Sequence, residues 1–493
     1  MSCMLARNAC SPGGSTVFSQ PWRGGRVLTQ TATPALCSVH SSQQPVMAVR
    51  RETSKLWETR APLSPQHVKK LVQKGVKVIV QPSDRRVYST EEYADVGAVI
   101  KEDMSEASLI MGVKTMSADS LMRDKTYAFF SHTIKGKADY MPLLDAILEK
   151  NIRLIDYEKM VDEYGQRLVA FGKYAGMSGM INILHGMGLR LLALGHRTPF
   201  MFIGPSHNYQ HTEMARQAVR DAGYQIALGR MSKSIGPLTF VITGSGNVSQ
   251  GAQEILNELP HEYIEPEDLP KVAAGGSKNK IYACVVSRDD HYVPKNGGTF
   301  NADEYERYPE RYASTFSHNI APYASCIING MYWAPGSPHL ITIPDAKKLL
   351  RPTDYAPRTP SSPGCPTLPH RLLAICDVSS DPGGAFEFVK ECTSIEKPFS
   401  LYDAEQNVNK ESFSGDGVLI CSIDNMPAQI PREATDFFGS LLLPYISEML
   451  KSDAKQPFQD YSCSPVVKNA VIASNGSLTP DYEYIQDLRR KSA

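Results

Sequence analysis

The chain of 493 residues lacks several features that would place it in a simple class. Its ten cysteines never form a C-x-x-C pair, and none lies between Cys37 and Cys284, so neither a disulfide scaffold nor a zinc ribbon is indicated. The 52 basic residues only equal the 52 acidic ones. Because no basic excess is available to neutralise phosphates, we predict small-molecule ligands and no nucleic-acid partner.

Acidic residues are missing from the whole stretch before Glu52, while arginines stand at positions 7, 23, 26, 50 and 51. This stretch is rich in Ser, Thr, Gln, Gly and Pro and has no continuous apolar run of the kind that a secretory signal needs. Such a composition is typical of an organellar transit peptide. We predict a mitochondrial transit peptide at 1–45, disordered, and a matrix location; a merely disordered N-terminus is the alternative.

A long apolar run free of charge is also missing. Residues 175–195 have the length of a membrane span but contain His185 and Arg190, both costly in hydrocarbon. The small residues Ala175, Gly179 and Gly186 favour a buried helix that packs closely against its neighbours. We therefore predict a long connecting helix and no membrane partner.

Short β-rich runs alternate with helical patterns from Val46 onward, which is typical of parallel sheets covered by helices. Helices are expected at 65–74, 138–150 and 249–259, a polar insertion at 285–318 and a loop at 351–369. We predict an α/β fold with two Rossmann-like domains, whose parallel sheets flank a substrate and cofactor cleft. Predicted strands of the first series are 46–50, 76–82, 108–114, 126–133, 152–158 and 167–172, and those of the second series are 237–246, 261–268, 281–287, 323–330, 372–379 and 417–424.

A glycine-rich turn, TGSGNVSQG at 243–251, follows an apolar strand and opens a helix. Such a turn lets the backbone and the helix N-terminus approach a pyrophosphate, although a tight turn without ligand is the alternative. Glu265, about twenty residues on, could bind a ribose 2′-hydroxyl and would favour NAD over NADP by charge repulsion. The predicted cofactor-binding residues are Gly244, Ser245, Gly246, Asn247, Val248, Ser249, Gly251, Glu265, Asn329, Gly330 and Asp377.

Ionisable side chains recur at predicted strand ends or loops of the first series, namely Arg60, Lys114, His132, Glu158 and Arg167. Arginines suit a substrate with carboxylates, and a lysine and a histidine suit proton transfer. Taken singly, each residue is more often a surface charge or a local hydrogen-bonding group. Their joint occurrence predicts a catalytic site.

Several segments carry a family resemblance. AVRRETSKLWETRAPLSP resembles the start of the N-terminal domain shared by alanine dehydrogenase, the nicotinamide nucleotide transhydrogenase and lysine-forming saccharopine dehydrogenases. The segments YAFFSHTIKG, LIDYEKMVDEYGQRLVAFG and DNMPAQIPREATDFFG resemble the lysine-ketoglutarate reductase half of the bifunctional aminoadipic semialdehyde synthase. The resemblance extends from about Val46 to the C-terminus.

The resemblance implies that L-lysine condenses with 2-oxoglutarate and that hydride from NADPH reduces the imine to saccharopine, the first step of lysine degradation. It implies that Lys114 and His132 are the acid–base pair, with Lys114 as the base and His132 assisting loss of water. The acidic Glu265 fits NADH better, so NADH is not excluded. By the same resemblance Arg60, Arg167 and Phe171 hold the keto acid, Glu158 and Lys135 tune the acid–base pair, and Asp424 lies near the nicotinamide.

The domain organisation follows from this match. We predict a substrate domain at 46–175 plus 428–485, and a dinucleotide-binding domain with insertions at 176–427; the chain then has no room for a second enzyme. No metal is predicted, because His207 and His211 lack a third ligand, and a homo-oligomer is left open. The alternatives are an alanine-dehydrogenase-like amino-acid dehydrogenase and a catalytically silent, dinucleotide-binding regulatory fragment.

Overall fold

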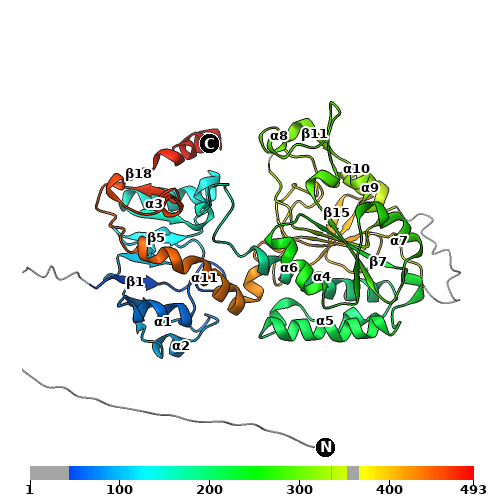
Figure 1. Ribbon diagram of the computed structural model, residues 1–493, viewed down its shortest axis with the longest axis horizontal. Coiled ribbons are helices and arrows are strands. Elements are labelled where there is room, and N and C mark those ends of the chain that lie inside the picture. The colour runs from blue at the N-terminus through cyan, green and yellow to red at the C-terminus, as the bar shows by residue number, and fades with distance from the viewer. Residues whose placement is uncertain (1–43, 335, 352–365, 493) are drawn as a thin grey trace, which may run out of the picture. The chain divides into compact units, whose positions relative to one another are not determined.

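The computed structural model describes residues 44–334, 336–351 and 366–492. The predicted transit peptide at 1–45 lies almost wholly outside this part of the chain, as does most of the predicted loop at 351–369. Two eight-stranded sheets, each dominated by parallel strands, form most of the described part, beside one two-stranded hairpin (Figure 1). The predicted α/β fold is confirmed.

The first sheet has the strand order β18-β17-β6-β5-β4-β1-β2-β3. The strands from residues 46–156 run parallel, while β17 pairs antiparallel with β6 and β18 with β17. Its members are β1 (Val46–Val49), β2 (Lys77–Val80), β3 (Val99–Ile100), β4 (Leu109–Met111), β5 (Thr126–Phe129), β6 (Arg153–Asp156), β17 (Val471–Ser474) and β18 (Ser477–Leu478).

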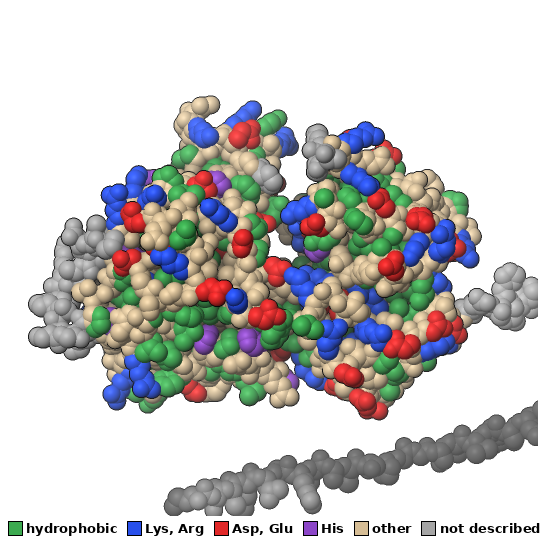
Figure 2. All heavy atoms as spheres, turned by 180° about the vertical axis from the view of Figure 1, so that it is seen from behind, with side chains coloured by type: hydrophobic (Ala, Val, Ile, Leu, Met, Phe, Trp, Pro, Cys, Tyr) green, Lys and Arg blue, Asp and Glu red, His purple; other side chains and the backbone are tan. Residues whose placement is uncertain are grey.

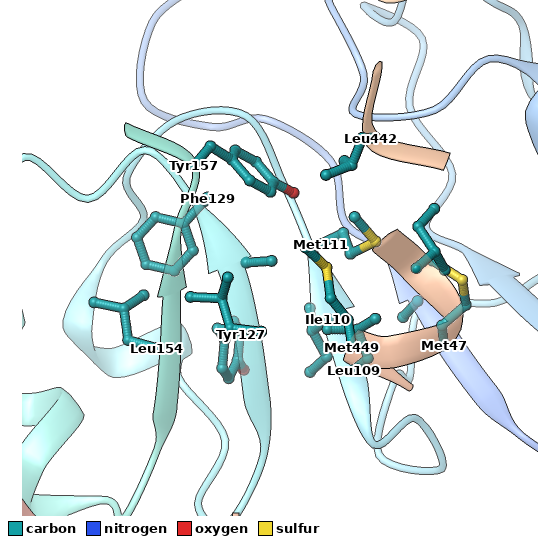
Figure 3. Packing of buried hydrophobic residues seen from close by; sticks show 14 of the residues in the cluster. Met47, Leu109, Ile110, Met111, Tyr127, Phe129, Leu154, Tyr157, Leu442 and Met449 are labelled. Atoms are coloured by element: carbon teal, nitrogen blue, oxygen red, sulfur yellow. The ribbon is translucent and has the colours of Figure 1, made fainter. Parts of the chain in front are cut away.

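Helices from both ends of the described chain complete the core of this sheet. On α11, Leu442 and Met449 face strand residues such as Met47 and Met111, all of them fully buried (Figure 3). Burial of each such side chain contributes roughly 1.5–3 kcal/mol, so the C-terminal segment is part of the first core. The helices with residues in this cluster are α1 (Pro65–Gln73), α2 (Thr90–Ala94), α3 (Met141–Glu149), α11 (Pro431–Met449), α12 (Pro465–Lys468) and α13 (Tyr484–Ser492).

The second sheet has the strand order β15-β14-β16-β13-β12-β7-β9-β8. The six neighbouring strands β16, β13, β12, β7, β9 and β8 are parallel, and β14 and β15 form an antiparallel edge beside β16. Its members are β7 (Leu238–Thr243), β8 (His261–Tyr263), β9 (Ile281–Val286), β12 (Cys326–Asn329), β13 (Ala374–Asp377), β14 (Ser400–Asp403), β15 (Val408–Lys410) and β16 (Val418–Cys421).

Two hydrophobic clusters enclose the second sheet. Helix α4 belongs to the cluster on one face, and the segments around α9 and α10 belong to the cluster on the other. The helices of this part are α4 (Gly172–Ala193), α5 (Thr212–Ala227), α6 (Asn247–Leu256), α7 (Leu269–Gly275), α8 (Ala302–Arg307), α9 (Phe316–Asn319) and α10 (Ile343–Leu349).

Most predicted elements are confirmed, but one predicted strand is wrong and two further features were not predicted. Residues 167–172 form no strand: Arg167 makes only an isolated bridge with Val161, and α4 already begins at Gly172. The insertion at 285–318 is ordered by a hairpin of β10 (Tyr292–Pro294) and β11 (Tyr312–Ser314) around buried tyrosines. The antiparallel edge strands of both sheets were not predicted, because they are short and some of them are polar.

Helix α4 confirms the predicted long buried helix. Gly179 faces Met426 and Cys376, and Gly186 faces Phe399, so the small residues do permit close packing. No helix in the described ranges combines the length and apolarity that a bilayer span requires.

The closest packing of α4 is against α6. A Cβ placed on Gly176 would collide with the Val248 carbonyl oxygen, and one on Gly251 with the Lys173 carbonyl oxygen. Because both obstacles are backbone atoms, neither can move without separating the two helices. This contact fixes the start of α6, and with it the glycine-rich turn.

Substitution of Gly251 tests this packing. Gly251→Ala should lower the free energy of unfolding by about 1–3 kcal/mol, because the added methyl group overpacks the helix contact. Thermal unfolding of the purified chain measures the effect, with Gly275→Ala as the control, since a Cβ at Gly275 meets nothing within 4 Å. Equal melting temperatures for the two variants would contradict this account.

Candidate functional site

A cavity of about 560 Å³ joins the carboxyl ends of strands from both sheets. A hollow between the two sheet-containing parts, bordered by basic and acidic side chains, is visible in the space-filling view (Figure 2). The cavity brings together twelve of the predicted site residues, namely Arg60, Lys114, His132, Lys135, Glu158, Arg167, Phe171, Gly246, Asn247, Val248, Gly330 and Asp424.

Lys114 follows β4 and is held through its backbone by a buried carboxylate. Glu52 accepts hydrogen bonds from the N–H groups of Val113 (2.7 Å) and Lys114 (3.1 Å), and Arg50 donates to the Lys114 carbonyl. Burial and the charge of Arg60 lower the pKa of the Lys114 ammonium below its ordinary value. Since the Lys114 Nζ has no hydrogen-bond or ion-pair partner among the described residues, it is a candidate proton acceptor.

His132 lies at the end of the β5 segment in a left-handed conformation, with φ 57°. Its Nδ1 lies 3.8 Å from the Glu158 carboxylate, which is a charge contact longer than a hydrogen bond. Glu158 also pairs with Arg167. Although burial opposes ionisation, His132, Arg167 and Lys135 together lower the pKa of Glu158 to about 2. The carboxylate therefore stays charged beside the imidazole at neutral pH.

Arg60 is the most constrained cation of the cavity. Its Nε and Nη2 donate to both oxygens of Glu58 at 2.8 and 2.6 Å, and Nη2 also donates to Asn425 Oδ1 at 2.8 Å. The guanidinium lies 4.2 Å from the ring centre of Phe171. Burial alone would raise the pKa of Glu58, but Arg60 and Asn425 lower it. The Arg60 Nη1 has no partner within the described ranges, so it can receive a ligand carboxylate.

The glycine-rich turn has the local geometry of an anion site. Gly244 has φ +86°, and a side chain there would meet Met331. Gly246 precedes α6, where a Cβ would meet nothing within 4 Å. No side chain caps α6, and the N–H groups of Asn247, Val248 and Ser249 have no acceptor among the described residues. These three donors and the helix dipole fit the pyrophosphate of a dinucleotide.

Other predicted cofactor residues lie outside the cavity lining. Gly251 and Ser249 are buried, and Gly251 packs against α4 as described above. Gly244 shapes the turn and Ser245 lies at its exposed tip. Glu265 is exposed after β8, at the same edge of the sheet.

A row of polar side chains crosses three neighbouring strands at that edge. Asn329 of β12 pairs in register with Thr243 of β7 and Asp377 of β13. Thr243 donates to Asn329 Oδ1 at 2.6 Å, and Asn329 Nδ2 and Ser379 donate to Asp377 Oδ1 at 2.9 and 2.8 Å. Asn329 and Asp377 therefore stabilise the strand ends next to the glycine-rich turn and do not line the cavity. The Oδ2 atom of Asp377 is buried with no described partner, and burial raises the pKa of this carboxyl to about 6.

Sequence reasoning missed several residues of the site. Glu58 and Asn425 complete the Arg60 network, and Glu52 holds the backbone of Lys114. Tyr332 and Asp381 line the cavity from loops that follow β12 and β13. The proximity of Glu58 to Arg60 in the sequence was a usable signal, whereas nothing in the local pattern marks Asp381.

Two histidines, His207 and His211, lie outside the lining of this cavity. The His207 ring lies 5.3 Å from Trp57, and its Nδ1 lies 3.3 Å from Gln429 Oε1. Within the described ranges no group of three or more His, Cys, Asp or Glu side chains has the arrangement of a metal site.

The alanine dehydrogenase/PNT N-terminal domain matches residues 48–178, and the C-terminal domain of the same family matches residues 373–481. In these two regions the chain is similar to the N- and C-terminal domains of the alanine dehydrogenase/PNT family. The two matched regions contain most of the cavity lining from the first sheet and the segment 378–427 from the second.

Whole proteins of known name are similar to the chain over most of its length. The mitochondrial alpha-aminoadipic semialdehyde synthase of Rattus norvegicus is 57% identical over 90% of this chain, and that of Arabidopsis thaliana is 36% identical over 91%. The chain spans 48% and 42% of these relatives, about half of their length. The NAD(+)-dependent, L-lysine-forming saccharopine dehydrogenase of Yarrowia lipolytica is 25% identical over 83% of this chain and 94% of its own.

Solved structures show the same fold. An L-alanine dehydrogenase aligns with a TM-score of 0.54 at 18% identity, covering 91% of this chain and all of its own. A transhydrogenase from Sinorhizobium meliloti aligns with a TM-score of 0.51 at 14% identity, covering 88% of this chain and all of its own. At these identities the likeness concerns the fold alone.

The buried Asp377 carboxyl gives a pH-dependent prediction. Its pKa is raised from 3.8 to about 6 in the folded chain, so stability is lost as the pH rises through this window. Asp377→Asn keeps an acceptor for Asn329 and Ser379 but has no charge. The free energy of unfolding of Asp377→Asn, compared with that of the parent chain, should therefore rise by up to about 3 kcal/mol between pH 4 and pH 7. This follows because one pKa unit corresponds to about 1.4 kcal/mol. Denaturant unfolding at the two pH values measures this, and a pH-independent difference would contradict it.

Proposed function

We propose that this chain is a lysine:2-oxoglutarate reductase, which condenses L-lysine with 2-oxoglutarate and reduces the imine to saccharopine. The observation that carries the proposal is a single cavity in which an unpaired, low-pKa lysine, two arginines and a glycine-rich turn meet. The 57% identity to a synthase named for alpha-aminoadipic semialdehyde supports it, as does the similarity to lysine-forming saccharopine dehydrogenases. Because the Rattus norvegicus synthase is named mitochondrial, we propose the mitochondrial matrix as the location of this chain.

The basic side chains of the cavity suit a keto acid with two carboxylates. Arg60 offers its free Nη1 and is oriented by Glu58, while Arg167 is half exposed and shares Glu158 with His132. A guanidinium held by a neighbouring carboxylate keeps its fork in place, so less entropy is lost when a ligand binds. Phe171, which stacks on Phe438 at 4.3 Å, provides an apolar wall beneath Arg60.

Lys114 and His132 can perform the proton transfers. Because the pKa of Lys114 is lowered, a larger fraction is neutral and can accept a proton from the ε-ammonium group of the incoming lysine. The neutral amine then attacks the keto carbon. His132, whose Nδ1 lies 3.8 Å from the Glu158 carboxylate, can donate the proton that accompanies loss of water. The labels of the pair are exchangeable, since both groups face the same cavity.

The cofactor that we propose is NADPH, with NADH as the alternative. When bound, the dihydronicotinamide supplies the hydride that reduces the imine carbon. The turn at Gly246 and the free N–H groups of α6 would hold its pyrophosphate. We propose accordingly that 46–175 plus 428–485 form the substrate domain and 176–427 the dinucleotide domain.

Three basic residues near β9, namely Lys278, Lys280 and Arg288, are candidates to bind a 2′-phosphate, but they lie at opposite ends of the strand. β9 pairs with β7 from Leu238↔Ile281 to Thr243↔Val286, so Lys278 and Lys280 lie before β9, about 20 Å from the turn at a strand rise of about 3.3 Å per residue. Only Arg288, which follows β9, lies at the edge that carries Gly244. Its guanidinium forms an exposed pair with Glu306 at 3.3 Å. Such a pair is weak, so Arg288 can turn to a phosphate.

The activity itself is the first test. NADPH oxidation by the purified chain should require lysine and 2-oxoglutarate together, and should be faster with NADPH than with NADH. Absorbance at the reduced nicotinamide band and identification of saccharopine by mass spectrometry measure it. Turnover with ammonia and pyruvate in place of these substrates would instead indicate an alanine-type dehydrogenase. Dinucleotide binding without any turnover would indicate a regulatory fragment.

Two substitutions separate chemistry from cofactor binding. Lys114→Met should lower kcat by about 10²- to 10⁴-fold, because it removes the proton acceptor, with little change in NADPH affinity. Gly246→Val should weaken NADPH binding and leave the fold intact, because its side chain enters open space where the pyrophosphate would lie. Steady-state kinetics and NADPH titration compare the two. The reverse pattern would show that the roles are wrongly assigned.

A further inference from the structure

We propose that Asp381 binds the α-ammonium group of the amine substrate and thereby selects a diamino acid over simple amines. This inference rests on the proposed function and goes beyond it, because it names the residue that recognises the non-reacting end of lysine. Asp381 lies in the loop after β13 and lines the cavity together with Ser379 and Tyr332.

The acidic residues of the cavity differ in their partners. Three lining residues are acidic, namely Glu158, Asp381 and Asp424. Glu158 pairs with Arg167, and Asp424 pairs with Lys55 at 2.7 Å. Within the described ranges Asp381 forms no ion pair at 4 Å or less. It is therefore the acidic group of the lining whose charge is left for a ligand.

The surroundings of Asp381 make an ionic ligand favourable. Burial raises the pKa of its carboxyl, and the more distant charges of Lys135 and Lys137 and the Trp333 backbone N–H offset this only in part. Its Oδ2 atom is buried without a hydrogen-bond partner in the described chain. An unpaired carboxylate in such a place costs free energy, and a bound ammonium group would remove that cost.

The chemistry of lysine explains why the cavity would need one unpaired carboxylate. Its ε-amine must lose a proton at Lys114 before it can react, whereas its α-ammonium group keeps its charge throughout. Arg60 and Arg167 come from segments of the first sheet and suit carboxylates, while Asp381 comes from the second sheet and suits a cation. A site built to pair one charged group of a substrate rejects analogues that lack this group.

A substrate analogue tests the inference directly. 6-Aminohexanoate has the reacting amine and the carboxylate of lysine but no α-ammonium group. In the parent chain we expect lysine to be preferred in kcat/KM by at least about 10- to 100-fold, comparable to the loss of one charged hydrogen bond. Asp381→Asn should raise the KM for lysine and reduce this preference to within a few-fold. The KM values for 2-oxoglutarate and NADPH should not change.

Two further variants control for structural effects. Asp139→Asn removes an exposed carboxylate outside the cavity lining and should leave all parameters unchanged. Asp381→Glu should restore part of the preference for lysine. Asp381→Asn itself should not lower the melting temperature, because it removes a half-buried, unpaired charge. Equal losses for lysine and 6-aminohexanoate would overturn the inference, as would an effect confined to the KM for NADPH, which would assign Asp381 to the nicotinamide carboxamide.

Failure of the proposed function would be recognised separately. If the parent chain shows no lysine-dependent turnover, the reductase assignment is wrong, and Asp381 is then judged by binding alone. Calorimetric titration of the NADPH-loaded chain with lysine and with 6-aminohexanoate would support the inference if only the lysine signal depends on Asp381. Equal lysine binding to the parent chain and Asp381→Asn would overturn it.

Discussion

The buried ion pair between Glu58 and Arg60 is the constraint on which the candidate site depends. Both side chains are almost inaccessible to solvent, and Asn425, from the segment after β16, bonds to both of them. Removing one member of such a pair leaves an uncompensated buried charge and costs about 3–5 kcal/mol. The network therefore ties the segment after β1 to a segment of the second sheet, and it fixes the guanidinium over Phe171.

The same pair sets the electrostatics of Lys114. Burial and the positive charge of Arg60 lower the pKa of the lysine, while the negative charge of Glu58 partly restores it. A lone arginine would lower the pKa further but would need other groups to satisfy its donors. With Glu58 in place, the cavity keeps one free N–H donor on Arg60 and a lysine that can lose its proton. In the proposed reaction, substrate recognition by Arg60 and proton transfer by Lys114 would thus be coupled through the Glu58 carboxylate, which neither step consumes.

The sequence predicted the buried parallel strands well, because continuous apolar runs mark strands covered on both faces. It also predicted, as site residues, twelve residues that the fold brings into one cavity. It failed where position depends on partners distant in the chain. The sequence predicted a strand that begins at Arg167. In the structure Arg167 forms only an isolated bridge with Val161, since α4 begins five residues later. Gly251 matched a cofactor fingerprint, yet it serves the contact of α6 with α4. Asn425 and Asp381 carry no local signal, because their roles arise only when two sheets meet.

The sequence and the fold point to different nucleotides as the cofactor. The edge after β8 and β9 is rich in acids, which alone would favour NADH by repelling a 2′-phosphate. However, Asp290 is engaged by the Ser287 N–H at 2.6 Å, so its charge already has a partner. Glu265 is exposed, where water screens its repulsion. Arg288 stands at the same edge in a weak surface pair, and a phosphate with two negative charges would compete well against a single carboxylate for its planar fork. If the proposed NADPH binds here, discrimination between the two nucleotides would depend on whether Glu306 or the 2′-phosphate holds Arg288, and not on the number of acidic residues at that edge.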